Sequence, residues 1–165
     1  EVLDLTTYST YNKDDDKLKI LYEPKDIFID ADKDRIVQVV SNLLNNAAKF
    51  IKEKEENDHQ DKEKERRRER RITILTQKAV QRGEEDNKLI VSITDNGQGI
   101  DPEVIPRLFT KFATKSFDGT GLGLYICKNI IEAHSGKIWA ENNKDGKGAT
   151  FSFSLPLPSQ ASPLA

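Results

Sequence analysis

Hydrophobic and polar residues alternate along the chain in a way that predicts strands at its start and a long amphipathic helix after them. Short alternating or β-rich runs over 17–22 and 27–30 are expected to be strands. From 34 to 51 hydrophobic residues return every three or four positions, which predicts a helix. Asp32 stands where its side chain can cap the first turn of that helix.

The remaining pattern predicts two pairs of antiparallel strands with helices between them. The expected elements are strands over 72–80 and 88–95, a short helix over 102–112, a long helix over 121–134, and strands over 137–142 and 149–155. Gly136 follows the second long helix and suits its C-cap. This order indicates an α+β fold, a two-layer α/β sandwich whose mixed, mostly antiparallel sheet is covered by helices on one face.

Length and composition favour a single domain. The chain has 165 residues, 1 cysteine and a formal net charge of -2. One cysteine excludes a disulfide framework, and the charge balance gives no reason to expect nucleic acid as a partner. No apolar run could span a membrane and no signal peptide is recognisable, so we expect a cytoplasmic chain without direct membrane contact. Because it starts at Glu1 and contains no methionine, we also expect it to be part of a longer protein.

Charge is concentrated between residues 52 and 71, where acidic and basic residues alternate without a large apolar side chain. This segment is interpreted as an insert, either a solvated helix extension or a mobile loop. A basic contact for nucleic acid over 66–71 is the alternative, but Glu63, Glu65 and Glu69 dilute its charge. The chain thus divides into a linker and end of a preceding helix over 1–16, a domain over 17–156 that carries the insert, and a flexible tail over 157–165.

The predicted helix over 34–51 has an unusual polar face. Its predicted apolar stripe comprises Ile36, Val37, Val40, Leu43, Leu44, Ala47 and Ile51. Asn42, Asn45, Asn46 and Lys49 fall on the other side. Asparagine is a mediocre helix former, whereas its carboxamide oxygen can coordinate a hard cation and a lysine can contact phosphate. The alternative is a tolerated polar face without a binding role.

A second candidate follows the apolar strand over 88–95. Asp95 ends this strand, and Gly97 and Gly99 come directly after it. A carboxylate beside backbone without β-carbons can recognise a flat heterocycle that carries an exocyclic amine. Taken alone, Asp-Asn-Gly is also simply a good turn sequence.

A third candidate leads into the predicted helix over 121–134. Gly119, Gly121 and Gly123 occupy every second position there. Amide groups at the N-terminus of a helix can bind polyphosphate. The spacing matches neither the dinucleotide-binding fingerprint nor the P-loop.

In this order and spacing, the three motifs resemble the catalytic and ATP-binding domain of sensor histidine kinases, within the ATPase superfamily that also holds gyrase and the heat-shock chaperone ATPase. The resemblance runs from about residue 30 to residue 156. The matching segments are 34–50 (N box), 95–99 (G1 box), 108–112 (F box), 119–123 (G2 box) and 146–151 (a G3-like ending). It implies the Bergerat-type ATP-binding fold, with ATP and Mg2+ as cofactors.

The resemblance also implies a role for each matching residue. Asn46 would bind Mg2+, Asn42 would support that face and Lys49 would contact phosphate, which makes these the expected catalytic residues. Asp95 would accept the adenine amine, and 113–120 would form part of a lid. The expected nucleotide contacts are Asn46, Lys49, Asp95, Gly97, Gly99, Ile100, Phe109, Phe112, Lys115, Gly119, Thr120, Gly121, Leu122, Gly123 and Thr150.

Two positions depart from the family's pattern. Thr114 and Lys115 stand where many relatives have an arginine, and Lys115 can supply the positive charge but not the bidentate geometry. Ala149 stands where threonine or serine is common.

Superfamily members that hydrolyse ATP tend to carry a glutamate four residues before the metal-binding asparagine, where it can activate water. Here that position is Asn42, so the resemblance implies that the γ-phosphate is kept for a histidine. His59 lies inside the charged insert, and His134 is expected to be a capping or partly buried residue. Neither is therefore the expected phosphate acceptor.

The acceptor histidine is expected on a dimerisation domain before residue 1, of which segment 1–10 would be the trailing edge, with a response regulator downstream. The parent protein would be a homodimer and this chain alone a monomer. Two alternatives stay open: a conformational ATPase or Ser/Thr-type protein kinase of the same superfamily, and a degenerate nucleotide sensor or scaffold. Cys127 is expected to be a small core thiol, with a redox sensor as its alternative.

Overall fold

The computed structural model describes residues 18–57, 70–79, 87–112 and 121–158, and for 52–57 the backbone alone. Its elements in chain order are β1 (Leu18–Tyr22), α1 (Lys33–Asn57), β2 (Arg70–Ala79), β3 (Lys88–Asp95), η1 (Ile105–Arg107), α3 (Gly123–Ala133), β4 (Lys137–Asn142) and β5 (Ala149–Pro156). None of the helices in these ranges has the length and apolar character needed to cross a membrane.

The boundaries expected around the domain fall partly outside the described residues, since 1–17, 58–69 and 159–165 are not among them. Both ends of the charged insert belong to regular elements, because α1 runs on to Asn57 and β2 begins at Arg70. Leu157, expected in the tail, donates its backbone N–H to the Asn87 carbonyl at 2.8 Å. The hydrogen-bonded part of the chain therefore includes the first residue after β5.

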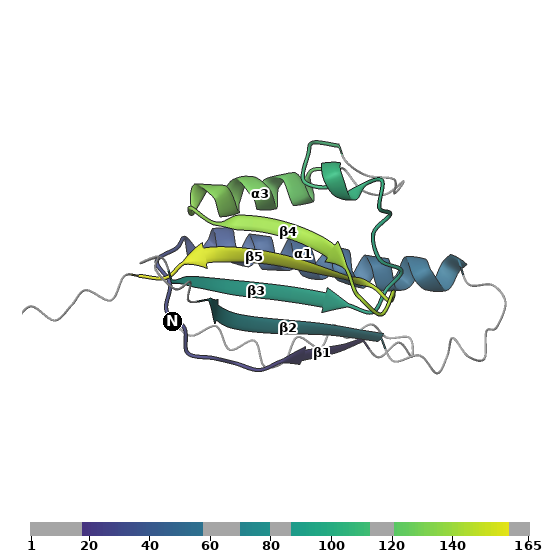
Figure 1. Cartoon of the computed structure of the whole chain (residues 1–165), viewed down its shortest axis with the longest axis horizontal. Helices are drawn as coiled ribbons and strands as arrows, with labels where there is room; N and C mark the ends of the chain where they lie inside the picture. The colour runs from purple at the N-terminus through teal and green to yellow at the C-terminus, as the bar shows by residue number, and fades with distance from the viewer. Residues whose placement is uncertain (1–17, 58–69, 80–86, 113–120, 159–165) are drawn as a thin grey trace, which may run out of the picture.

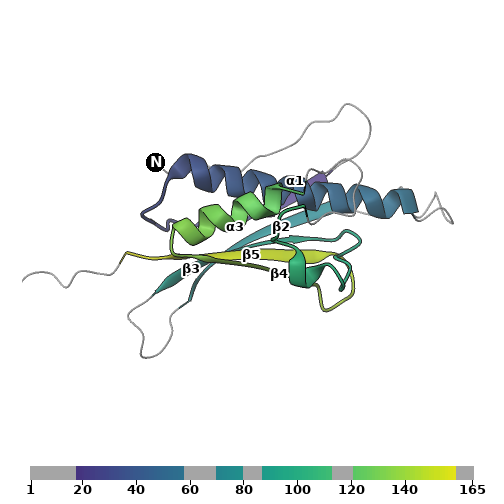
Figure 2. The same ribbon diagram turned by 90° about the horizontal axis from the view of Figure 1, so that it is seen from above.

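The strands form one five-stranded sheet in the order β1-β2-β3-β5-β4. β1 pairs with β2 in parallel, and the other neighbouring pairs are antiparallel. Figure 1 shows the sheet face-on, and Figure 2 shows α1 and α3 together over one of its faces. The predicted α+β two-layer sandwich is therefore confirmed, with the sheet mixed and mostly antiparallel.

The hydrophobic core lies between the sheet and the two helices. Along β5, Phe151, Phe153 and Leu155 are each at most 2% exposed and belong to one buried cluster with Leu43 and Ala47 of α1. Burial of one large apolar side chain contributes about 1.5–3 kcal/mol. Every second residue of the strand and every third or fourth residue of the helix point into the same core. The packing of these side chains holds the two layers together.

The buried stripe of α1 is rotated relative to the predicted one. Val39, outside the predicted stripe, is 0% exposed, whereas Val37, inside it, is 38% exposed. The rotation follows from the packing of α3 against α1, which covers the side of the helix that carries Val39. It also places the partly buried Asn42 and Asn46 at the edge of the core.

The start of α1 and the end of α3 are joined by their capping residues. Asp32 Oδ1 accepts the N–H of Arg35 at 3.1 Å, which confirms Asp32 as the cap of α1. His134 Nε2 accepts the backbone N–H of Asp32 at 3.1 Å, so the proton of this ring lies on Nδ1, which donates to the Ile130 carbonyl at 2.8 Å. His134 is thus the partly buried capping residue that the sequence predicts.

The C-cap of α3 differs in detail from the prediction. The left-handed residue is Ser135, with φ 58°, rather than Gly136. Gly136 instead donates its N–H to the Ile131 carbonyl at 2.9 Å, as the second residue after the cap does in a Schellman motif. It is needed for space, because an added Cβ would lie 2.0 Å from the Ser154 carbonyl oxygen.

Two predicted elements are wrong. Residues 27–30 alternate in burial as a strand would, with Phe28 75% exposed and Ile29 packed on the core, but they form no strand. Alternating burial shows only that every second side chain faces the core. A strand also needs a neighbouring strand with which its backbone can form hydrogen bonds. The helix expected over 102–112 is reduced to the 3-10 turn η1, since Pro106 lacks an N–H and restricts the residue before it.

Candidate functional site

Asp95 is the buried charge of the candidate site. It ends β3 and is 2% exposed. Its Oδ1 accepts the N–H of Gly97 at 2.8 Å and, with a longer contact of 3.4 Å, the N–H of Ala149. A carboxylate is costly to bury unless donors face it. The two amides therefore stabilise Asp95 and fix how its carboxylate is turned.

Gly97 joins this loop to α1. A Cβ added at Gly97 would lie 2.8 Å from Asp95 Oδ1 and 2.8 Å from the carbonyl carbon and oxygen of Phe50. The next residue, Gln98, donates its N–H to the Phe50 carbonyl at 3.3 Å. Any side chain at position 97 would therefore push the Asp95 carboxylate away from the helix that carries the asparagines.

The turn between β4 and β5 follows from the predicted strand pair, but the sequence did not indicate that it closes the other side of the loop. Asn142 exchanges two hydrogen bonds with the backbone of Ile100, both at 2.7 Å. Asn143 Nδ2 donates to the Asp95 carbonyl at 2.9 Å. These contacts join residues 42 and 48 positions apart. The only sequence signal for them is a pair of asparagines at a strand end, where side-chain amides often bond to backbone.

Thr150, an expected nucleotide contact, lies away from the Asp95 carboxylate. Its Oγ1 contacts Thr94 Oγ1 at 2.9 Å and donates to Asn143 Oδ1 at 2.8 Å. Successive residues of a strand point to opposite faces, so Thr94 and Thr150 lie on the face opposite to Asp95. Ala149, and not Thr150, therefore meets the Asp95 carboxylate.

At the other end of the site, α1 meets the start of α3. A Cβ added at Gly123, the first residue of α3, would lie 4.0 Å from Asn42 Cγ. The cap residue Leu122 has no side-chain acceptor and the first turn of α3 has no acidic residue, so among the described residues of this helix none neutralises the positive end of its dipole. Asn46 and Lys49 follow Asn42 along the same side of α1 and are partly buried, whereas Asn45 is exposed.

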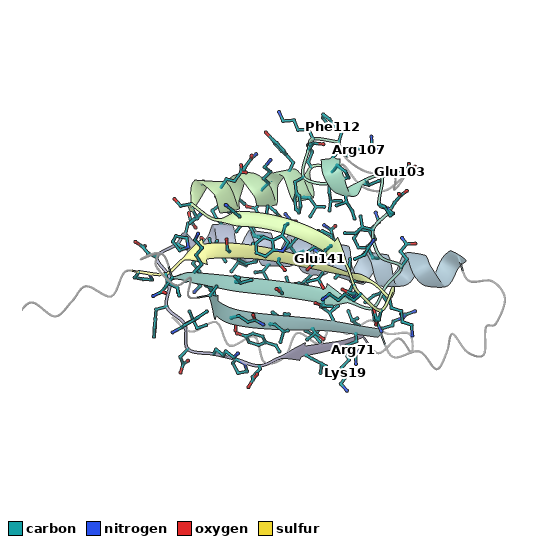
Figure 3. All side chains as sticks on the ribbon, viewed as in Figure 1. Lys19, Arg71, Glu103, Arg107, Phe112 and Glu141 are labelled. Carbon is teal, nitrogen blue, oxygen red and sulfur yellow. The ribbon has the colours of Figure 1, made fainter. Side chains whose placement is uncertain are left out.

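The segment before α3 carries the aromatic residues of the expected lid. Phe109 packs against the core, but Phe112 is 71% exposed and has φ 60°. Phe112 donates its N–H to the Gly121 carbonyl at 3.1 Å, which brings the two ends of the lid segment together. Lys115, Gly119 and Thr120 lie outside the described residues. Figure 3 shows Phe112 with Arg107 and Glu103 near the start of α3, far from Lys19 and Arg71 at the β1–β2 edge.

Lys111 and Tyr125 link this segment to α3. The Lys111 Nζ lies over the Tyr125 ring, 5.2 Å from its centre. A hydrogen bond from Asn129, together with the charge of Lys111, lowers the pKa of Tyr125 below its ordinary value. The helix dipole and the charge of Lys111 both make the electrostatic potential at the start of α3 more positive, which suits an anionic ligand.

The donor set suits Mg2+ only in company with phosphate. Within 18–51, 70–79, 87–112 and 121–158, where side chains are described, there is no group of three or more His, Cys, Asp or Glu residues that could hold a metal ion. Mg2+ commonly keeps several waters and binds through substrate phosphates and few protein oxygens. A single carboxamide oxygen from the asparagines of α1, which meets the start of α3 at Asn42, fits Mg2+ that is bound mainly by phosphate and water.

Cys127 is 0% exposed and receives the Asn42 Nδ2 at 3.7 Å from its Sγ. It is the core thiol that the sequence predicts, and burial raises the pKa of this thiol above its ordinary value. The unfolded chain therefore loses the thiol proton at lower pH than the folded chain. The stability contributed in this way is present below about pH 8.5 and is lost as pH rises above it.

We expect the urea midpoint to fall more between pH 7.5 and pH 10 in the wild type than in Cys127→Ala, because only the wild type loses the contribution of the thiol. Lysines and tyrosines titrate in both chains and cancel in the comparison. We also expect iodoacetamide to label native Cys127 at least ~100-fold more slowly than the urea-unfolded chain. Equal pH slopes and rapid native labelling would show that the thiol is accessible and unperturbed.

Comparisons with known proteins agree with this geometry. The family described as histidine kinase-, DNA gyrase B-, and HSP90-like ATPases matches residues 31–159. The chain is 36% identical to Sensor protein FixL of Bradyrhizobium diazoefficiens, over 85% of this chain and 24% of FixL. It is 33% identical to Sensor histidine kinase WalK of Bacillus subtilis, over 80% of this chain and 19% of WalK. The chain thus spans about a quarter or less of the length of these relatives.

Solved structures give the same result. The catalytic domain of histidine kinase ThkA superposes with a TM-score of 0.62 and 29% identity, over 87% of this chain and 81% of that domain. The sensor histidine kinase MprB, at 22% identity, has a TM-score of 0.63 and supports the fold alone. The chain therefore belongs to the family of histidine kinase-, DNA gyrase B- and HSP90-like ATPases, as an ATP-binding domain of the sensor histidine kinase type.

Proposed function

We propose that this chain binds Mg-ATP between the Asp95 loop, α1 and the start of α3, and donates the γ-phosphate to a histidine on a separate dimerisation domain of its parent protein. The observation that carries this proposal is the buried Asp95 carboxylate, with α1 on one side of its loop and the β4–β5 turn on the other. A buried acceptor that is fixed by backbone donors suits an exocyclic amine of a flat base.

Each part of the site has a proposed role. Asp95 accepts the adenine amine, and Gly97, Gly99 and Ile100 form the wall beside it. Asn46 supplies a carboxamide oxygen to Mg2+, and Lys49 contacts phosphate. The amides of Gly121, Leu122 and Gly123 receive the phosphates at the start of α3. For Lys115, Gly119 and Thr120 the resemblance alone supports a role in the lid.

The chemistry would consist of positioning and charge neutralisation. Bound Mg2+ would neutralise charge on the phosphates during transfer. Asn42 is not a general base, and its amide is directed to Cys127 Sγ at 3.7 Å. A site without a base to activate water favours transfer to another acceptor over hydrolysis.

The described residues support an acceptor outside this chain. His134 uses both ring nitrogens within the fold, one on Ile130 and one on Asp32. His59 lies outside the described residues. A histidine-bearing dimerisation domain of the same parent, and a response regulator that receives the phosphate, are the proposed partners in two-component signalling. The parent is proposed to be a homodimer, with this domain in the cytoplasm.

We expect titration calorimetry to show roughly micromolar binding of ADP and of a non-hydrolysable ATP analogue. Asn46→Ala should weaken binding about tenfold when Mg2+ is present and little when it is absent, because the side chain acts through the metal. Asn45→Ala is the matched control, since Asn45 is the exposed neighbour on the same helix. Steady ATP hydrolysis by the wild-type chain would favour a conformational ATPase instead, and no nucleotide binding by the folded chain would exclude the proposal.

A further inference from the structure

We propose that Asn142 and Asn143, named here the amide latch, are positioning residues that set how strongly and how selectively this site binds adenine. This inference rests on the proposed function and deepens it. The two asparagines belong to the end of β4 and the turn after it, and they lie between the five boxes that define the family resemblance rather than in one of them. They act through the backbone of the loop that begins at Asp95.

Asn142 holds the end of that loop. Its Oδ1 accepts the N–H of Ile100 at 2.7 Å, and its Nδ2 donates to the carbonyl of Ile100 at 2.7 Å. One carboxamide thus satisfies both backbone groups of one residue, as a neighbouring strand would. The fit is close, because a Cβ added at Gly99, where φ is +84°, would lie 2.9 Å from Asn142 Oδ1.

Asn143 holds the start of the loop. Its Nδ2 donates one hydrogen to the Asp95 carbonyl at 2.9 Å and the other to the Lys147 carbonyl at 2.6 Å. Its Oδ1 accepts the hydroxyl of Thr150 at 2.8 Å. Because Thr150 gives its only hydroxyl proton to Asn143, Thr94 is the donor in the 2.9 Å contact between the two threonines. Asn143 therefore ties the Asp95 backbone to both the turn and β5.

The latch matters for recognition because the Asp95 carboxylate is carried by the backbone that the latch holds. The carboxylate must stay within hydrogen-bond distance of the ligand amine, and a displacement of about 1 Å can cost a large part of such an interaction. Ile100, 6% exposed, is the wall residue at the other end of the same loop. Release of either end would therefore loosen the base pocket and leave the phosphate end at α3 in place.

The test compares ADP with purine riboside 5′-diphosphate, which lacks the 6-amine, by calorimetry and competition at a temperature where each variant is folded. Asn142→Ala removes both bonds to Ile100. Asn142→Asp keeps the shape and the acceptor but loses the donor. Lys144→Ala, exposed on the same turn, is the matched control.

We expect Asn142→Ala to weaken ADP about tenfold and the amine-free analogue less than twofold, so that the preference for ADP shrinks by about fivefold or more. Asn142→Asp should lie between Asn142→Ala and wild type, and Lys144→Ala should match wild type. Hydrogen exchange at the Ile100 amide should be faster in Asn142→Ala.

The outcomes separate this inference from the proposed function. Wild-type binding of ADP with unchanged preference in both Asn142 variants overturns the amide latch alone. Equal weakening of the two ligands also overturns it, because a general loss of structure would act on both. A wild-type chain that is folded and binds neither ligand overturns the proposed function and the latch together.

Discussion

Asp95→Asn is expected to lower ADP affinity by about 100-fold or more, roughly 2.7 kcal/mol, although the two side chains have nearly the same shape. Oδ1 of Asp95 accepts the N–H of Gly97 at 2.8 Å. In the variant the single carboxamide oxygen must take that bond, which turns the NH2 group toward the ligand. The NH2 group of the new side chain would then face the adenine amine. The substitution would replace a hydrogen bond by two donors that face each other without an acceptor.

The same substitution should leave the fold intact. It removes a charge from a side chain that is 2% exposed and keeps the acceptor for Gly97, so the free energy of unfolding should be unchanged or higher. Calorimetry with ADP and urea unfolding measure the two effects separately. Asp30→Asn, at an exposed carboxylate, is the matched control. ADP affinity within threefold of wild type in Asp95→Asn would contradict the assignment of Asp95 to the base.

Gly148→Ala is expected to lower the free energy of unfolding by about 3 kcal/mol or more, whereas Gly146→Ala should lower it by about 1 kcal/mol. Both glycines lie on the β4–β5 turn with left-handed backbone, at φ +80° and +72°. They differ in the space around them. A Cβ at Gly148 would lie 2.0 Å from the Asp95 carbonyl oxygen, and one at Gly146 would have nothing within 4 Å.

Gly146→Ala thus reports the cost of the backbone angle alone, and the difference between the variants reports the contact with Asp95. Urea unfolding measures the difference, and ADP titration should show that Gly148→Ala also weakens binding in the fraction that remains folded, because Asp95 must move. Equal destabilisation by both variants would mean that the turn yields to the added methyl group and that the Asp95 backbone is not held by Gly148.

The sequence by itself determined the features that depend on local pattern. The 3.6-residue period and its cap placed α1, because a capped amphipathic segment forms a helix wherever it packs. Alternation predicted β2 to β5 and the antiparallel pairs β2–β3 and β4–β5, but not the pairing of β3 with β5 that joins them. Asp95 and the glycines after it were recognisable because the resemblance rests on residues close together in the chain.

Tertiary packing alone decided the features that depend on a distant partner. Val39 rather than Val37 became part of the core because α3 covers that side of α1. Residues 27–30 form no strand although their burial alternates, since a strand needs a hydrogen-bonding neighbour that no local pattern supplies.

The same distinction separates the two halves of the candidate site. The residue types proposed to bind the nucleotide can be listed from motifs, but the amide latch cannot, because Asn142 reaches Ile100 across 42 positions. The register of β5 against β3 turned Thr150 away from Asp95 and brought Ala149 to it. Local sequence thus determined which groups the site contains, and strand register and loop contacts determined where those groups point, because hydrogen bonds between distant segments exist only once the sheet has formed.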